Sequence, residues 1–336
     1  MPIIIFFSAL TSLLYYWGVL QRIVWAVAWV MTKAMHLSGA ESLAAAANVF
    51  LGQTEAPLVI KPYIPKMTRS EIMALMTGGM ATIAGSVMGA YIGFLGGDDP
   101  QAQAEFARMF LCASLMNAPA ALLVAKLLVP ESQPVNEDLS VPRSHAGRNA
   151  LDAIATGTTQ GLKLALNVAA MLVAFLALIA LLNWILGLVG GLGQDGGAIN
   201  RAVASASGGV FDSLSLEALL GFLFAPVAWL IGIESSDLLL IGQLLGKKVA
   251  ANEFVAYLDL GSMKAASQVS PRSVFIATFA LCGFANFGSI GIQIGGIGAL
   301  APEQRPMLAE LGLKALLGGT LASLLTASLA GMFFAG

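Results

Sequence analysis

The stretch from Asn48 to Pro57 places polar side chains and a proline between two strongly apolar flanks. Such flanks belong in a bilayer, because 57% of the chain is hydrophobic and only 11% is charged, where soluble proteins carry about 25% charge. A charged side chain at the centre of a transmembrane helix costs roughly 2.5–3.5 kcal/mol, so Glu55 needs a partner, a ligand or a watery cavity. Gly52 and Pro57 interrupt helical hydrogen bonding, which membrane proteins tolerate only in buried or cavity-lining backbone. We therefore predict the tip of a re-entrant hairpin that forms half of a binding site.

The composition and the missing motifs exclude several classes of protein. A net charge of −2 provides no basic patch, so we expect no nucleic acid partner. The two histidines, His36 and His145, are too scattered for a histidine-based metal centre, and we expect no organic cofactor. The sequence has no His-Glu-x-x-His, Gly-x-Ser-x-Gly or Gly-x-Gly-Asp motif, which argues against an intramembrane enzyme. A channel or a receptor stays open as an alternative to a transporter.

The order of apolar and polar segments predicts a polytopic helical protein. A first long span is expected over residues 3–32, and the hairpin over 36–63. Thr68 and Glu71 have the spacing of a capping box, and the helix they open contains a glycine-rich interruption between Gly78 and Ser86. Further segments are expected as a span over 102–129, an amphipathic interfacial helix over 150–167, a span over 169–188, a glycine-rich connection over 190–209, apolar stretches over 214–232 and 237–258, an interrupted helix after Ser270, and a last span over about 307–334.

A series of patterns recurs in the same order in the two halves of the chain. A polar pair ending in glutamate (Thr54-Glu55, Asn252-Glu253) precedes an Arg-Ser helix start and then a glycine-interrupted span. Such corresponding segments indicate a secondary transporter with its site at the interface of two repeats. The predicted fold is an all-α polytopic membrane protein, an inverted repeat with two re-entrant helical hairpins and two interrupted transmembrane helices. Its parts are a scaffold transmembrane helix (1–35), the first transport repeat (36–130), a loop with an interfacial helix and a scaffold helix (131–195), and the second repeat (196–336).

The polar residues of these segments also have plain structural interpretations. Glu55 can cap the amino end of a half-helix, and Glu253 can lie at a water interface. Isolated Ser, Thr and Asn side chains in membranes more often hydrogen-bond between helices than bind ligands. That reading applies to Thr82, Asn286 and Ser289, although their coincidence with helix breaks favours ligands.

Several motifs together resemble the concentrative nucleoside transporter family. They are Gly52-Gln-Thr-Glu-Ala-Pro57, Lys61-Pro-Tyr63, Met76-Thr-Gly-Gly-Met80, Asn252-Glu-Phe-Val-Ala-Tyr257 and Cys282-Gly-Phe-Ala-Asn-Phe-Gly-Ser289. The resemblance covers nearly the whole chain. It implies a homotrimer in which each protomer has a scaffold part and a mobile transport part. It also implies further membrane segments ahead of Pro2.

The resemblance assigns a role to each candidate residue. It implies that Gln53, Thr54 and Glu55 hold the nucleobase, with Val87 and Phe284 packing nearby, and that Glu253, Asn286 and Ser289 meet the ribose. The sodium site that it implies takes the side chains of Asn48 and Thr82 and the carbonyls of Leu51 and Ile83. We therefore expect a symporter that imports nucleosides of the uridine, cytidine or adenosine type by alternating access. Its expected place is the bacterial cytoplasmic (inner) membrane, with sodium as the co-transported ion and a proton-coupled symporter as the alternative.

Overall fold

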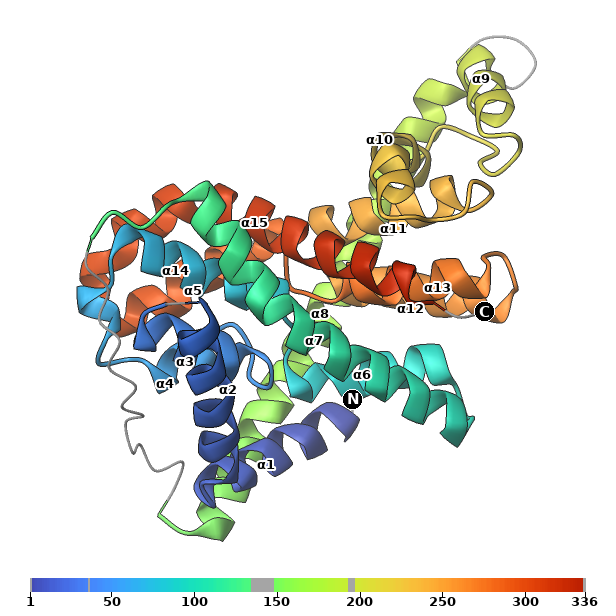
Figure 1. Ribbon diagram of the computed structural model, residues 1–336. Helices are drawn as coiled ribbons and strands as arrows, with labels where there is room; N and C mark the ends of the chain where they lie inside the picture. Colours follow the sequence, from blue (N-terminus) through green and yellow to red (C-terminus); the bar gives the residue numbers. More distant parts are fainter. Residues whose placement is uncertain (1, 36, 134–147, 193–196, 335–336) are drawn as a thin grey trace. The chain divides into compact units, whose positions relative to one another are not determined.

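The computed structural model describes residues 2–35, 37–133, 148–192 and 197–334. All regular secondary structure in these ranges is helical, in agreement with the predicted all-α class (Figure 1). The chain divides into two compact units, one of residues 1–166 and 282–326 and one of residues 167–281 and 327–336. The loop predicted at 131–148 lies largely outside the described residues.

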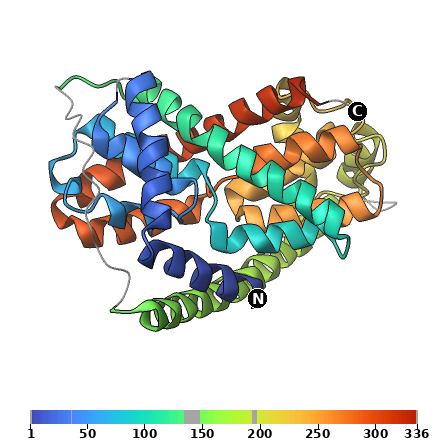
Figure 2. The ribbon, with the colours of Figure 1, turned by 60° about the horizontal axis from the view of Figure 1, so that its bottom comes forward.

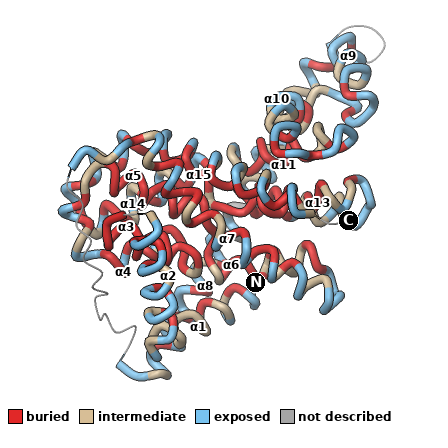
Figure 3. The backbone as a smooth tube through the Cα atoms, viewed as in Figure 1, coloured by how far each residue is buried: buried red, intermediate tan, exposed pale blue. Residues whose placement is uncertain are grey.

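The first unit is built around the hairpin and the first interrupted helix. All residues of α3 and all but the first of α5 are buried (Figure 3). The elements of this unit are α1 (Pro2–Tyr16), α2 (Val19–Met35), α3 (Gly39–Asn48), α4 (Ala56–Val59), η1 (Ile64–Lys66), α5 (Arg69–Ala81), α6 (Gly85–Gly96), α7 (Pro100–Leu128), the start of α8 (Ala150–Gly190), α14 (Phe287–Leu300), η2 (Pro302–Gln304) and most of α15 (Arg305–Met332).

The long span predicted over residues 3–32 is not one straight helix. The chain forms α1 and α2 instead, and their axes differ by 78° across a short break. Gly18 at this break has φ +73°, a left-handed conformation that glycine adopts without a steric penalty. A glycine at the turn therefore bends the apolar segment that its hydropathy presents as one span.

The interfacial helix predicted over 150–167 is not separate from the span that follows it. Residues 150–190 form one continuous helix, α8. Its first part lies against α1 (Figure 2), where a Cβ on Gly157 would come within 2.7 Å of Ser12 and one on Gly161 within 2.8 Å of Ile5. The glycines of this segment are thus explained by close helix packing, while its apolar side chains Leu151, Leu162 and Leu166 stay exposed in the single chain.

The second unit contains the hairpin of α10 (Leu216–Leu230) and α11 (Leu238–Ala250). These helices approach closely, since a Cβ on Gly242 would lie 2.7 Å from the Gly221 carbonyl oxygen. The other elements are the remainder of α8, α9 (Ala198–Ala206), α12 (Glu253–Ala265), α13 (Pro271–Leu281) and the end of α15. The sequence predicted a glycine-rich connection without a helix over 190–209, and this is wrong for the nine residues that form α9.

Several helices are long and apolar enough to cross a membrane. Four segments of the described chain meet this criterion, and α1 with α2 would make a fifth if the bent pair is one span. The four are Arg69–Gly96, Pro100–Leu128, Val173–Gly190 and Pro302–Met332. They agree with the predicted spans, including the interrupted one, and define a multi-pass membrane protein.

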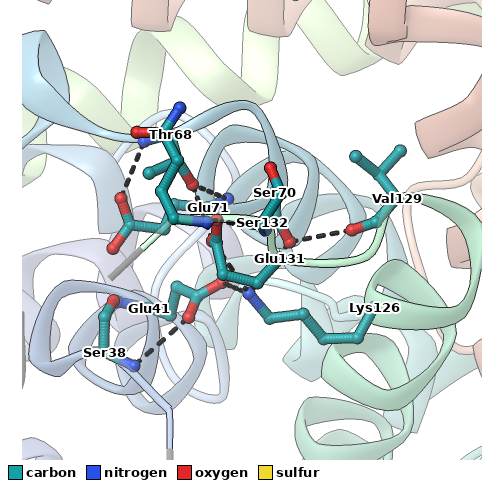
Figure 4. Close-up of polar contacts among 10 residues, drawn as sticks. Ser38, Glu41, Thr68, Ser70, Glu71, Lys126, Val129, Glu131 and Ser132 are labelled. Carbon is teal, nitrogen blue, oxygen red and sulfur yellow. Dashed lines mark hydrogen bonds and ion pairs between the residues drawn. The ribbon is translucent and has the colours of Figure 1, made fainter. Parts of the chain in front are cut away.

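A polar network anchors the start of the hairpin to α5 and α7 (Figure 4). The Lys126 ammonium lies 2.5 Å from the fully buried Glu41 carboxylate and 3.6 Å from Glu131, and it donates a hydrogen bond to Ser70. Glu41 completes a capping box with Ser38, and Glu71 completes the predicted one with Thr68. The network therefore holds the amino ends of two helices beside the carboxyl end of a third.

Replacing Lys126 by Met should destabilise the protein by about 3–5 kcal/mol, because it leaves the Glu41 carboxylate buried without its counter-ion. Thermal unfolding of the detergent-solubilised protein would measure this loss. The double variant with Glu41→Gln should recover much of it. The matched control is Glu310→Gln, which breaks an exposed ion pair with Arg69 and should change little. Equal destabilisation by the single and double Lys126 variants would contradict this account.

Candidate functional site

The tip of the first hairpin is the first component of the site. Residues 49–55 form the turn between α3 and α4. The Glu55 carboxylate folds back onto this turn and accepts a hydrogen bond from the Gly52 N–H at 3.2 Å, while the Gly52 carbonyl accepts one from the Glu55 N–H at 3.0 Å. Glu55 therefore supports the backbone of the tip, but its side chain makes no capping hydrogen bond to α4, the structural role that the sequence left open.

A cavity of about 430 Å³ opens on the tip within the first unit. Its lining includes Glu55 and Leu51 from the tip, Ser86 from α6, and Thr156 and Gln160 from α8. Ligand sites commonly have volumes of roughly 300–1,000 Å³, so this cavity is large enough for a small polar molecule. Glu55 is thus half-buried at the tip and reachable from an open space.

The break between α5 and α6 is the second component. Thr82, Ile83 and Ala84 leave the helical path, and Thr82 donates a hydrogen bond from its hydroxyl to the Gly78 carbonyl at 2.9 Å. The Gly85 N–H at the start of α6 donates to the Phe50 carbonyl of the tip at 3.0 Å. The hairpin tip and the helix break are therefore joined through their backbones.

Asn48 lies where the tip meets this break. It is 1% exposed, and neither atom of its side-chain amide has a hydrogen-bond partner among the described residues. A Cβ on Gly78 would lie 3.1 Å from the Asn48 Nδ2, so the amide lies against Gly78 of α5. The carbonyl of the same Gly78 accepts the hydrogen bond from the Thr82 hydroxyl. A buried amide without a partner is costly, which makes this position a candidate for a bound ion.

The second break places α14 against the hairpin tip. Asn286 caps α14 by accepting a hydrogen bond from the Ser289 N–H at 2.9 Å. The Ser289 hydroxyl in turn accepts a bond from the Gln53 Nε2 at 3.0 Å, which leaves the buried Gln53 Oε1 without a partner among the described residues. Phe284 is half-buried within the break. Predicted ligands that are more than 200 residues apart in sequence thus meet in the first unit.

The other predicted nucleoside ligands lie at the hairpin tip, in α6 and in α12. Thr54 is exposed at the tip beside Gly296 of α14, and Val87 is buried in the first turn of α6. Glu253 belongs to the second unit, where it is 5% exposed at the first position of α12. The Asn252 side chain caps that helix by accepting a hydrogen bond from the Val255 N–H.

Sequence reasoning missed four buried polar residues near these breaks. In the second unit, Lys248 donates to the Ala280 carbonyl and Tyr257 to the Thr278 carbonyl, so both satisfy the carboxyl end of α13. In the first unit, Gln293 of α14 donates to the Met76 carbonyl, and Asn117 of α7 contacts both breaks. Gln293 and Asn117 are lone polar side chains in apolar runs, and only the tertiary partner of each distinguishes it from a packing residue.

Replacing Asn286 by Ala should weaken nucleoside binding by roughly tenfold to hundredfold, since an unpaired buried partner costs about 1–3 kcal/mol. The same change removes a helix cap worth about 1 kcal/mol. Ser215→Ala is the matched control, because Ser215 caps α10 in the same way and is not a predicted ligand. Equilibrium binding of radiolabelled nucleoside would show the difference. Equal affinities in the two variants would remove Asn286 from the site.

Two family models match the chain. One is described as nucleoside recognition and covers residues 1–98, and the other is described as the Na+ dependent nucleoside transporter C-terminus and covers residues 109–331. An uncharacterized transporter from Haemophilus influenzae is 44% identical over 99% of this chain and 75% of its own length. Sodium/nucleoside cotransporter 1 from Rattus norvegicus is 39% identical over 99% of this chain and 50% of its own length.

Solved structures show the same similarity. CNTnw in an inward-facing substrate-bound state is 42% identical, with a TM-score of 0.85 over 99% of this chain and 74% of that one. A double variant of CNTnw in an outward-facing state is also 42% identical, with a TM-score of 0.85 over 99% of this chain and 73% of that one.

Apolar spans, a hairpin tip and two interrupted helices define a membrane transporter, and the relatives are transporters rather than enzymes, as the sequence predicts. The two family models that match, and the 44% identity to a relative over 99% of the chain, identify the family within this class. The chain belongs to the concentrative nucleoside transporter family, which confirms the resemblance carried by its motifs.

Proposed function

We propose that this protein imports nucleosides by sodium symport with alternating access. The observation that carries the proposal is the buried amide of Asn48, which has no partner among the described residues and lies beside the break at Thr82. The family description and the name of the Rattus norvegicus cotransporter support the same coupling ion. Sodium here is a transported substrate rather than a resident cofactor.

The donor set suits sodium. A hard cation prefers oxygen ligands, and the Asn48 Oδ1 and the Thr82 hydroxyl oxygen supply two of them. Thr82 directs its proton to the Gly78 carbonyl, so the lone pairs of its oxygen stay available to an ion. Leu51 and Ile83 lie in the non-helical tip and break, where their carbonyls can serve as the other two ligands.

The nucleoside site uses the groups around the second break. A nucleobase edge carries both donors and acceptors, which the amide of Gln53 can pair with in either orientation. Thr54 and Glu55 complete the base site, and Val87 and Phe284 pack beside it. Ribose hydroxyls pair with Asn286 and Ser289, and the family resemblance also implies Glu253 as a ribose ligand. The expected substrates are nucleosides of the uridine, cytidine or adenosine type.

The energetics make one sodium ion sufficient for accumulation. One charge moved through 100 mV is worth roughly 2.3 kcal/mol, which corresponds to about fiftyfold accumulation before any sodium gradient is added. Both sites depend on the same hairpin tip, since Asn48 ends α3 and Gln53 follows five residues later. Ion binding can therefore order the tip on which the nucleoside site depends.

We propose that the protein is a homotrimer and that it lies in a bacterial inner membrane. Apolar side chains of the span Val173–Gly190 are largely exposed in the single chain, among them Val173, Leu178 and Trp184. Such a surface suits lipid and contacts between protomers. Native mass spectrometry of the detergent-solubilised protein should give three copies, and a monomer at all concentrations would exclude the trimer.

Uptake of radiolabelled uridine into proteoliposomes tests the function. Sodium would be replaced by potassium or choline at fixed pH and membrane potential, and the accumulated compound would be checked chemically. Sodium-dependent accumulation of unchanged nucleoside is expected. Accumulation that follows an imposed proton gradient without sodium would favour the proton-coupled alternative, and equilibration without accumulation would indicate a channel.

A further inference from the structure

Asn117 contacts both interrupted helices at once. It lies in α7, is fully buried, and donates hydrogen bonds from its Nδ2 to the Ala81 carbonyl at 2.7 Å and to the Cys282 carbonyl at 2.9 Å. Its Oδ1 accepts a hydrogen bond from the Thr326 hydroxyl of α15 at 2.5 Å. All the polar atoms of this side chain are therefore satisfied by fixed partners from three other segments.

The two carbonyls stand directly before the two predicted sites. Ala81 is the last residue of α5 and precedes the predicted sodium ligands Thr82 and Ile83. Cys282 is the first residue of the break that holds the predicted nucleoside residues Phe284 and Asn286. A single amide group thus connects the backbone on which the sodium site is built to the backbone on which the nucleoside site is built.

Direct contact between the two breaks strengthens this connection. A Cβ on Gly283 would lie 2.7 Å from the Ala81 carbonyl oxygen, so the breaks meet without an intervening side chain. Each break leaves helix carbonyls without their usual partners, and in an apolar interior these need other donors. An amide NH2 has two protons and can serve two carbonyls together, which neither a hydroxyl nor a carboxylate can do.

The two carbonyls determine how the amide is oriented. Because both neighbours of the Nδ2 are carbonyl acceptors, a flipped amide would place its oxygen against two oxygens and its NH2 against a hydroxyl. The hydrogen-bond partners therefore distinguish the two flip states of the Asn117 amide and favour the one with its NH2 toward the carbonyls. A change in the distance between the two carbonyls therefore lengthens or breaks at least one bond to this group, unless the amide moves with them.

We propose that Asn117 is the positioning residue through which sodium occupancy at the first break raises nucleoside affinity at the second. The inference rests on the sodium-coupled function proposed above. Asn117 need not touch either substrate, because it acts through the two carbonyls it holds. Allosteric couplings of this kind are typically about 5–150-fold, and they are reciprocal between the two ligands.

The test compares nucleoside affinity with and without sodium. Equilibrium binding of radiolabelled uridine to the purified full chain in nanodiscs would be measured in sodium and in choline for the wild type, Asn117→Asp and Thr326→Val. We expect the wild-type affinity ratio to be at least about fivefold and the Asn117→Asp ratio to fall to about twofold or less. Thr326→Val should give an intermediate ratio, and Thr326→Ser should restore it.

Ser114→Ala is the matched control, because Ser114 lies one turn earlier on α7 and its hydroxyl is paired with the Cys282 thiol, at 4.0 Å, rather than with either carbonyl. Its ratio should equal that of the wild type. A wild-type ratio retained in Asn117→Asp would overturn the inference, even if the variant bound uridine more weakly in both buffers. If Asn117→Asp does not fold, an unchanged ratio in Thr326→Val would overturn it instead. A wild-type ratio of one would reject the sodium-coupled function itself, and with it this inference.

Discussion

Replacing Gly283 by Ala should destabilise the protein by about 2–6 kcal/mol and abolish nucleoside binding. Gly283 has φ +146°, where a non-glycine residue costs about 1–3 kcal/mol. The added Cβ would also lie 2.7 Å from the Ala81 carbonyl oxygen and 2.8 Å from that of Met80, and overpacking costs about another 1–3 kcal/mol. Both contacts are with backbone, which has little freedom to move away.

The measurement is thermal unfolding of the purified protein together with uridine binding. Gly291→Ala is the control, because a Cβ there would meet no heavy atom within 4 Å among the described residues and Ala favours helix by about 1 kcal/mol. That variant should unfold at the wild-type temperature or slightly above. A Gly283→Ala protein with wild-type stability and binding would show that the breaks do not meet as described.

Replacing Asn48 by Ala should raise the sodium concentration for half-maximal uptake by about tenfold to hundredfold, since hydrogen bonds and contacts to charged groups contribute about 1.5–3 kcal/mol. The variant removes one proposed ion ligand and no internal hydrogen bond, because the amide has no partner among the described residues. The fold should therefore be retained. Uptake at saturating sodium should approach that of the wild type.

Ser42→Ala is the matched control for Asn48. Ser42 lies on the same helix α3, is equally buried, and has a hydroxyl without a partner in the described part of the chain. Its loss should leave the sodium dependence unchanged. Sodium titrations that coincide for the wild type and Asn48→Ala would move the ion site away from the first break.

Much of the fold could be predicted because its signals are local. The capping box at Thr68 and the glycine-rich interruption before Ser86 are encoded within a few residues, and the structure has both. The hairpin tip follows from Gly52 and Pro57 for the same reason. The roles of the predicted ligands, in contrast, come from the family resemblance, and they stay predictions until the variants are measured.

The failures of prediction share a different cause. The amphipathic pattern over 150–167 did not show that this segment continues into the next span as one helix, or that its glycines lie against α1. Gly18 bends the first apolar segment by 78°, although hydropathy averages over such a residue. In both cases the property that mattered was a direction in space, which a one-dimensional pattern does not contain.

The amino-acid sequence by itself determined that this is a helical membrane protein with interrupted helices, and its motifs determined the family. Those properties follow from hydropathy, from glycine and proline, and from short polar motifs, all of which act within a few residues of chain. Only the tertiary structure decided that Gln53 meets Ser289 and that Asn117 holds the Ala81 and Cys282 carbonyls together. The reason is physical, since a broken helix exposes carbonyls whose partners come from distant segments that packing alone brings near.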